Sequence, residues 1–170
     1  MSKIRKTINA HWRRFTSSER GTQLVELAIV LPVVMLFFAA TAEFGRYFYT
    51  YTTLAKATRS GARYLATASI RDTATEDRRA RNLVMCGDPL ATCDDANTVV
   101  SGLEASHIEI RRERENAATS ALPETVTVEI DGFNYQPLFN LAALVGQGVS
   151  LNLEVRPSTT MRYLLTQPPL

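Results

Sequence analysis

The chain has few of the residues on which several protein classes depend. Its 170 residues include 2 cysteines, 2 histidines and 1 tryptophan. Two cysteines are too few for a disulfide-rich miniprotein. Its 19 basic and 17 acidic residues nearly cancel, so the formal charge of +2 gives no reason by itself to expect nucleic acid as a partner. A hydrophobic content of 45% excludes a disordered or collagen-like chain.

Known catalytic motifs are also missing from the sequence. It contains no G-x-S-x-G, no H-E-x-x-H and no phosphate-binding glycine-rich loop. His11 lies in the basic N-terminal segment, which leaves His107 as a lone histidine in the rest of the chain. Gly146-Gln147-Gly148 fits a turn better than a nucleotide site. We therefore predict that the protein is not an enzyme and has no cofactor or metal.

The basic residues gather at the N-terminus. The first 20 residues carry six basic side chains and one acidic side chain, Glu19, a local charge of +5. The remaining 13 basic and 16 acidic residues give the rest of the chain a charge of −3. The basic residues of the N-terminal segment are Lys3, Arg5, Lys6, Arg13, Arg14 and Arg20. This charge suits anionic lipid and explains the segment without nucleic acid.

A long apolar run follows this basic segment. Sixteen of the 19 residues from Leu24 to Ala42 are apolar, and the exceptions are Glu26, Pro32 and Thr41. A helix needs about 20 such residues to cross the hydrocarbon core of a bilayer. Since positively charged flanks stay in the cytoplasm, we expect one transmembrane helix with a cytoplasmic N-terminus and a C-terminal domain outside the cytoplasm.

Three fates of the exported chain are compatible with the residues. Ala40-Thr41-Ala42 could be a signal-peptidase site that releases a soluble protein. The apolar helix could instead remain as the permanent anchor of a bitopic protein whose outer domain binds a ligand or partner. The third fate depends on Glu26, because an ionisable group near the start of a membrane helix needs a partner, a function or access to headgroup water.

Gly21 and Glu26 together resemble the processing site of type IV pilin-like proteins. The basic leader ends in Gly21, Glu26 is the fifth residue counted from Thr22, and the apolar run follows. The resemblance implies that a prepilin peptidase cuts between Gly21 and Thr22. Glycine lets the backbone adopt an extended form in a protease cleft. The new amine of Thr22 could then pair with the carboxylate of Glu26, in the same subunit or in its neighbour, and set the register of assembly.

The segment beyond the processing site is similar to the TadE-like family of pseudopilins from tight-adherence (Flp, type IVc) pilus systems. The similarity rests on Gly21, Glu26, the apolar run with Pro32, Glu43 to Arg46, and Gly61 to Tyr64. A weaker similarity returns at residues 159–163, and Leu27 stands where many members of the family have an aromatic residue. The resemblance implies a minor or priming component of a pilus. Its partners would be other pilin-like subunits, the pilus assembly machinery, the prepilin peptidase and membrane lipid.

The helix should continue beyond the membrane. Apolar residues recur at steps of three and four as far as residue 68, which predicts an amphipathic helix whose stripe packs on the outer domain or on a partner. The predicted stripe consists of Phe44, Tyr47, Phe48, Tyr51, Ala55, Thr58, Ala62 and Leu65. In addition, Tyr47, Tyr49 and Tyr51 suit an aromatic belt at the outer membrane interface.

Residues 69–105 are polar and rich in turn-forming residues, so we predict a loop region there. Cys86 and Cys93 lie within it and are separated by six residues. A zinc site would need two further ligands at workable spacing, which the chain does not offer. If the domain lies outside the cytoplasm, a disulfide is the better interpretation.

After residue 105 the apolar residues alternate, which is typical of half-buried antiparallel strands. The alternation runs through 107–111, 125–131 and 149–156, and residues 160–164 could resume the last strand after Pro157. Residues 137–145 read as a short apolar helix or loop. We predict an α+β fold in which a long helix packs on a small sheet. Its parts are a leader at 1–21, the helix at 22–68, the loop region at 69–105 and the sheet domain at 106–170.

Overall fold

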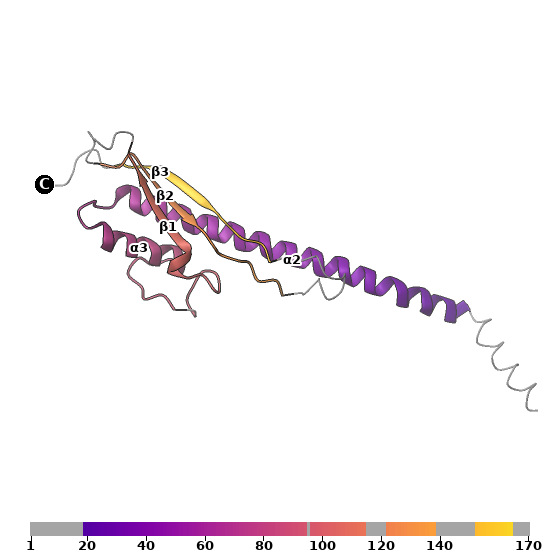
Figure 1. The fold of residues 1–170 in the computed structure, drawn as a ribbon. Helices are drawn as coiled ribbons and strands as arrows, with labels where there is room; N and C mark the ends of the chain where they lie inside the picture. Colours follow the sequence, from indigo (N-terminus) through magenta and orange to yellow (C-terminus); the bar gives the residue numbers. More distant parts are fainter. Residues whose placement is uncertain (1–18, 95, 115–121, 139–151, 165–170) are drawn as a thin grey trace, which may run out of the picture. The chain divides into compact units, whose positions relative to one another are not determined.

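The computed structural model describes residues 19–94, 96–114, 122–138 and 152–164 (Figure 1). The chain divides into two compact units, Met1–Glu43 and Phe44–Leu170. A long apolar helix and a three-stranded antiparallel sheet make up most of the described structure, so the predicted α+β fold is confirmed. Most of the predicted leader lies outside the described residues.

Helix α2 runs from Glu19 to Thr67 and contains 49 residues. Of the helix predicted over 22–68, α2 contains residues 22–67. Pro32 lies inside α2, and the helix continues on both sides of it. Proline is tolerated in transmembrane helices because neighbouring groups can satisfy the freed carbonyl.

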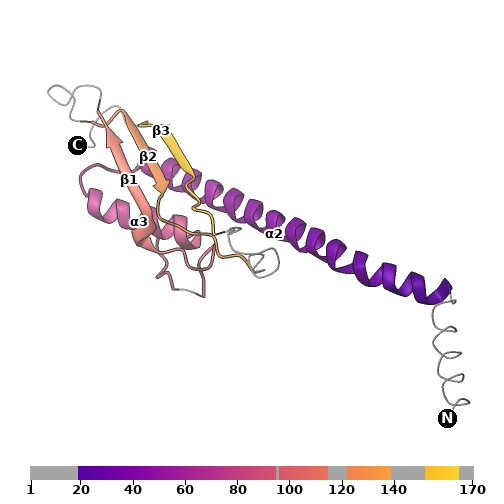
Figure 2. The same cartoon turned by 45° about the vertical axis from the view of Figure 1, so that its right-hand side comes forward.

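The sheet consists of β1 (Ile108–Glu113), β2 (Thr125–Ile130) and β3 (Ser158–Arg162), all antiparallel and in the order β1-β2-β3 (Figure 2). Val126 and Val128 point to the buried side of β2, and Thr125 and Thr127 point outward, as the alternation predicts. The face turned away from the helices is polar on all three strands.

The third strand differs from the prediction. Residues 149–151 of the predicted strand lie outside the described residues, and Glu154 forms only an isolated bridge with Asn134. The strand proper begins after Pro157, whose carbonyl accepts a hydrogen bond from the Ile130 amide at 3.0 Å. Proline is compatible with the start of a strand because only its missing N–H is lost to the ladder. The predicted helix or loop at 137–145 falls almost wholly outside the described residues.

The polar segment 69–105, predicted as loop, contains helix α3 (Thr73–Cys86). Asp72 begins the helix, since its carboxylate accepts from the Thr75 amide at 3.1 Å. Gly87 ends it in the left-handed conformation, φ 78°, with its amide bonded to the Leu83 carbonyl. Few apolar residues are needed, because the helix buries only a narrow stripe containing Ala80, Val84 and Met85. A short 3-10 turn, η1 (Ala105–His107), leads into β1.

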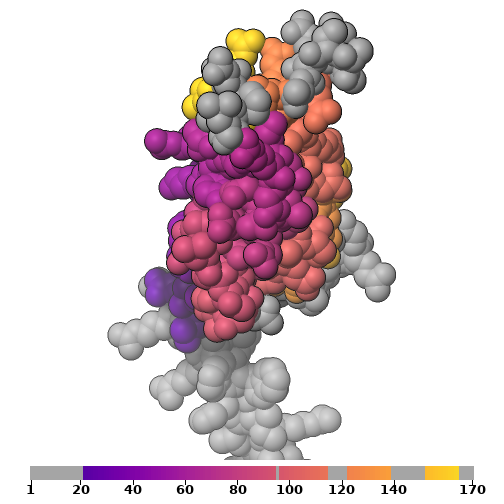
Figure 3. Space-filling view, turned by 90° about the vertical axis from the view of Figure 1, so that its left-hand side faces the viewer, coloured from indigo at the N-terminus to yellow at the C-terminus, as the bar shows by residue number. Residues whose placement is uncertain are grey.

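The second unit has two layers, with α3 and the α2 segment from Phe44 onward packed against one face of the sheet (Figure 3). Gly61 of α2 faces both α3 and β2. A Cβ there would lie 2.6 Å from Val84 Cγ2 and 3.7 Å from Val128 Cγ1. Ala57, Ala62 and Ala66 on the same helix are also buried. Small residues therefore let α2 lie close to both α3 and the sheet.

The C-terminal strand holds the end of α2 in place. Thr58 Oγ1 lies 3.2 Å from Thr159 Oγ1, and the Leu164 amide donates to the Ala66 carbonyl at 2.9 Å. The Tyr163 hydroxyl donates to the Ala68 carbonyl. The Ala66 carbonyl is one that the last turn of the helix leaves without a partner, and the Ala68 carbonyl lies just beyond the helix end.

Candidate functional site on the N-terminal helix

The part of α2 that belongs to the first unit exposes most of its large apolar side chains. Eleven of those between Leu24 and Phe38 are 48% to 73% exposed, and Leu36 is partly buried. The eleven exposed residues are Leu24, Val25, Leu27, Ile29, Val30, Leu31, Val33, Val34, Met35, Phe37 and Phe38. Among the described residues, Gly21–Thr67 is the one helix that is long and apolar enough to cross a membrane, by length and composition. A helix that is apolar all round requires lipid or other helices as its surroundings.

Gly21, Thr22 and Glu26 lie together in the first two turns of this helix. Residues four apart in a helix share a face, so the Glu26 side chain lies one turn from Thr22 on the same side. Glu26 is exposed, and within the described part of the chain its carboxylate takes part in no hydrogen bond or ion pair. This arrangement can place an acceptor for a cation at the N-terminal tip of the apolar helix.

The predicted cleavage site is helical. Gly21 is the third residue of α2 as described. Glycine in a helix costs about 1 kcal/mol relative to alanine. The glycine therefore lowers the cost of unwinding the helix at the predicted cut.

Cys86 and Cys93 belong to the other unit, where a disulfide joins them. Their Cα atoms lie 6.0 Å apart, within the ordinary range for a disulfide. Two hydrogen bonds support the closed loop: Asn82 Nδ2 donates to the Ala91 carbonyl at 2.9 Å, and the Leu90 amide donates to Asp88 Oδ1 at 2.8 Å. The loop is thus held both covalently and by polar contacts.

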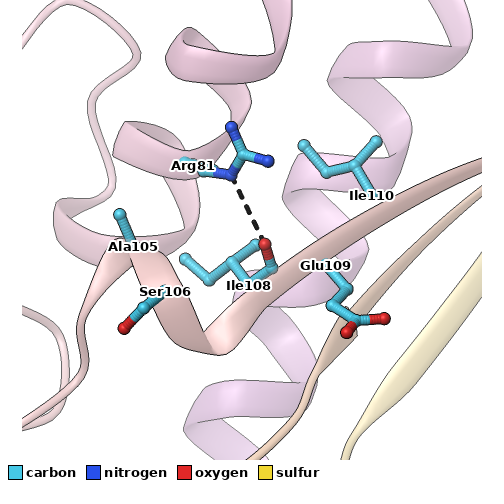
Figure 4. A pocket seen from close by; sticks show the side chains of 6 residues that line it. All are labelled: Arg81, Ala105, Ser106, Ile108, Glu109 and Ile110. Atoms are coloured by element: carbon cyan, nitrogen blue, oxygen red, sulfur yellow. Dashed lines mark hydrogen bonds between the residues drawn. The ribbon is translucent and has the colours of Figure 1, made fainter.

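Described residues of the second unit line two of its hollows. One of about 530 Å³ lies beside β1, where Arg81 Nε donates to the Ile108 carbonyl at 3.4 Å (Figure 4). The residues that line it are Arg81, Ala105, Ser106, Ile108, Glu109 and Ile110. The Ser106 hydroxyl donates to the Glu104 carboxylate at 3.2 Å in an exposed position. The other, of about 490 Å³, lies between α3 and the disulfide loop. The described residues contain no group of three metal-ligating side chains.

Several charged residues of the second unit form ion pairs. Arg112 bonds Asp77 of α3, and Arg111 bonds Glu109 and Glu129 on the outer face of the sheet. Arg156 pairs with Asp131. Acids thus alternate with bases on this face, as expected for a solvated strand surface and unlike the basic patch of a nucleic-acid-binding protein.

Two tyrosines have shifted pKa values. Burial raises the pKa of Tyr163, whose hydroxyl bonds Ala68. Burial, followed by a hydrogen bond to the Glu76 carboxylate, raises the pKa of Tyr64. Both hydroxyls hold together parts of the second unit, so they act in its structure and not in chemistry.

The sequence did not reveal that α2 needs a small residue at position 61. Gly61 was notable only for its place in a resemblance, and its contact with Val84 could not be foreseen because α3 was itself missed. The predicted apolar stripe is half correct: Thr58, Ala62 and Leu65 are buried, whereas Phe44, Phe48 and Tyr51 are exposed. Nothing in the alternation of apolar residues separates these two groups.

The comparison with known proteins bears on the N-terminal region. No curated protein matches the chain, and no solved structure does. The model of one family matches residues 21–63, a segment that begins at Gly21 and lies wholly within α2. That family is described as TadE-like protein, and the resemblance predicted from the sequence is thereby confirmed over this segment.

Proposed function

We propose that the protein is a minor or priming pseudopilin of a tight-adherence pilus, assembled through the apolar first half of α2. The observation that carries the proposal is the near coincidence of two boundaries. The TadE-like match begins at Gly21 and the apolar surface begins at Leu24, with Glu26 as the third residue of the apolar run. A helix with apolar side chains on all sides can exchange lipid for neighbouring helices without refolding.

The leader is cut by a prepilin peptidase at the Gly21–Thr22 bond. The cut leaves the apolar helix intact and places a new α-amine at its tip. The Glu26 carboxylate lies one helical turn away and exposed, so it can accept that amine from its own chain or from a neighbour. Pairing the two charges reduces the cost of keeping each in an apolar environment.

The N-terminus lies in the cytoplasm and the second unit lies in the periplasm. The basic residues before Gly21 favour this orientation. The Cys86–Cys93 disulfide agrees with an oxidising compartment for the second unit. The partners are other pilin-like subunits, the assembly machinery, the prepilin peptidase and membrane lipid, and neither a cofactor nor nucleic acid is required.

N-terminal sequencing of the protein from cells that carry the pilus system tests the proposal. We expect mature chains that begin at Thr22, and we expect Gly21→Leu to keep the leader because the added side chain prevents the close approach of the backbone to the protease. Chains that begin at Met1 would identify a permanent anchor, whose second unit then serves a ligand or partner. Chains that begin at Glu43 would identify a secreted protein.

Glu26→Ala separates processing from assembly. We expect this variant to be cut at the same bond and to yield few or no pili, because the new amine loses its partner. Glu26→Asp, which keeps the charge on a shorter side chain, is the matched control and should retain part of the assembly. Electron microscopy of sheared pili measures the result, and a wild-type number of pili in Glu26→Ala would remove the ion pair from the proposal.

A further inference from the structure

Four aromatic side chains remain exposed on α2 just after the apolar run. The exposed fractions are 69% for Phe44, 59% for Phe48, 71% for Tyr49 and 41% for Tyr51. Tyr47 alone among the aromatic residues of this stretch packs on the second unit, with its ring 5.4 Å from that of Tyr135 in an edge-to-face contact. Four large aromatic rings on two turns of helix leave an apolar surface that water covers poorly.

The positions of these rings around the helix indicate what covers them. With about 100° per residue, Phe48 lies about 40° from Phe44 and Tyr51 about 20° on the other side, whereas Tyr49 lies about 140° away. One docked helix would cover a stripe about 100° wide and would leave Tyr49 in water. The four rings therefore spread around the exposed side of α2 within about two helical turns. This spread is expected if an apolar medium, and not a single partner helix, covers them.

The height of the rings fits the interfacial layer of a membrane. The run from Leu24 to Ala42 spans about 28 Å as a helix, close to the thickness of the hydrocarbon core. Phe44 follows two residues later, so the aromatic level begins where the core ends. Arg46 is exposed at the same level and can reach lipid phosphate with its guanidinium group. The Thr52 hydroxyl is already satisfied by the Tyr49 carbonyl at 3.0 Å.

The same end of the second unit carries further exposed apolar residues. Tyr135, which contacts Tyr47, donates a backbone hydrogen bond from its amide to the Leu153 carbonyl at 2.9 Å. Leu153 is 45% exposed, and Leu138, three residues after Tyr135, is 68% exposed. In Figures 1 and 2 the segment that follows β2 runs back along α2. Exposed apolar groups thus come from two segments of this unit.

We propose that Phe44, Phe48, Tyr49 and Tyr51 form a belt in the outer headgroup layer of the membrane. The belt rests on the proposed function, because it requires that the apolar run span the membrane. It differs from the belt predicted from the sequence, since Tyr47 is used in packing and the two phenylalanines take part.

Fluorescence of single-tryptophan variants tests the belt. The full chain, with its native tryptophan removed by Trp12→Phe, is reconstituted in vesicles of phosphatidylcholine and phosphatidylglycerol. Phe48→Trp reports the belt, Val34→Trp the middle of the apolar run, and Leu90→Trp the exposed disulfide loop. The vesicles contain lipid brominated either near the headgroup or near the chain ends. We expect the indole at position 48 to be quenched about twofold more strongly by the shallow bromines, the one at 34 more strongly by the deep bromines, and the one at 90 by neither.

Each alternative result contradicts a different part of the proposal. If position 34 is quenched while position 48 emits like position 90, the run spans the membrane and the belt is wrong. If position 48 gives blue-shifted emission without quenching by either lipid, a second copy covers the aromatic rings and the lipid assignment is wrong. If position 34 is not quenched at all, the membrane span fails, and with it the proposed function.

Discussion

The two halves of α2 use apolar residues in opposite ways. Between Leu24 and Phe38 the side chains are large and exposed all round the helix, whereas between Leu54 and Ala66 the buried positions are mostly alanine and glycine. A half that meets lipid or other helices gains from large side chains, because every direction around it is apolar. A half that packs on its own unit gains from small ones, because they allow close approach. The same secondary structure thus meets two different environments, and side-chain size distinguishes them better than hydrophobicity does.

A charge placed in the first half gives the largest expected effect. We expect Val34→Arg to reduce membrane integration severely, because an arginine at the centre of a span costs about 2.5 to 3.5 kcal/mol on insertion scales. Fractionation with alkaline extraction of membranes measures the retained protein. In the second half, Arg59→Val changes an exposed position and should leave both integration and stability nearly unchanged. Full retention of Val34→Arg would show that the first half does not need an apolar environment on every side.

A methyl group added at Gly61, in the second half of α2, gives the next largest expected effect. Gly61→Ala places a Cβ 2.6 Å from Val84 Cγ2, so we expect the free energy of unfolding to fall by about 1 to 3 kcal/mol. Denaturant unfolding of the full chain in detergent measures it.

Two further variants decide whether that contact is the cause. Gly45→Ala has nothing within 4 Å of its new Cβ and should stabilise the helix slightly, by up to about 1 kcal/mol. Adding Val84→Ala to Gly61→Ala removes the clashing atom, and the pair should be more stable than the sum of the single variants predicts. Equal effects of Gly61→Ala and Gly45→Ala would deny the close approach of α2 and α3.

Alkaline pH gives the smallest effect and should act on the second unit alone. Burial raises the pKa of Tyr163 in the folded state, so the folded protein favours the protonated phenol. Its stabilisation is full below the unfolded pKa of about 10 and is lost as the pH rises through the higher folded value. Unfolding midpoints measured between neutral and strongly alkaline pH should fall less steeply in Tyr163→Phe. An identical slope in both proteins would show that this phenol does not link stability to pH.

Periodicity in the sequence revealed the elements whose burial is regular. The apolar run and the alternation at 107–111 and 125–131 correspond to α2, β1 and β2. Helix α3 was missed because it is mostly charged and buries only a narrow stripe. Its ends were nevertheless marked in the sequence, by Asp72 before the helix and Gly87 after it. A search for capping residues would have found what a search for apolar stripes did not.

The third strand shows a different limit. Ser158–Arg162 alternates only weakly in hydrophobicity, and its inward side chains include Thr159, whose partner Thr58 belongs to α2. The sequence alone does not distinguish a threonine that packs against another threonine from a threonine that faces solvent. The candidate site was easier to predict, because Gly21 and Glu26 are defined by their spacing along one helix. Whether the bond after Gly21 is cut depends on a partner enzyme, and folding alone does not specify it.

The hydrogen bonds between the last strand and α2 also determine the order in which the protein can be completed. Thr58 and Thr159 are 101 residues apart, and Tyr163 and Ala68 are 95 apart. Contacts so distant along the chain form slowly, because the intervening loop must close first. Ribosomes make the helix long before residue 163 exists, so the apolar segment can enter a bilayer while the rest of the chain is still unfolded. Closure of the domain by its final strand would then be the last event of biogenesis, and a chain truncated before Ser158 should insert normally yet remain sensitive to proteases.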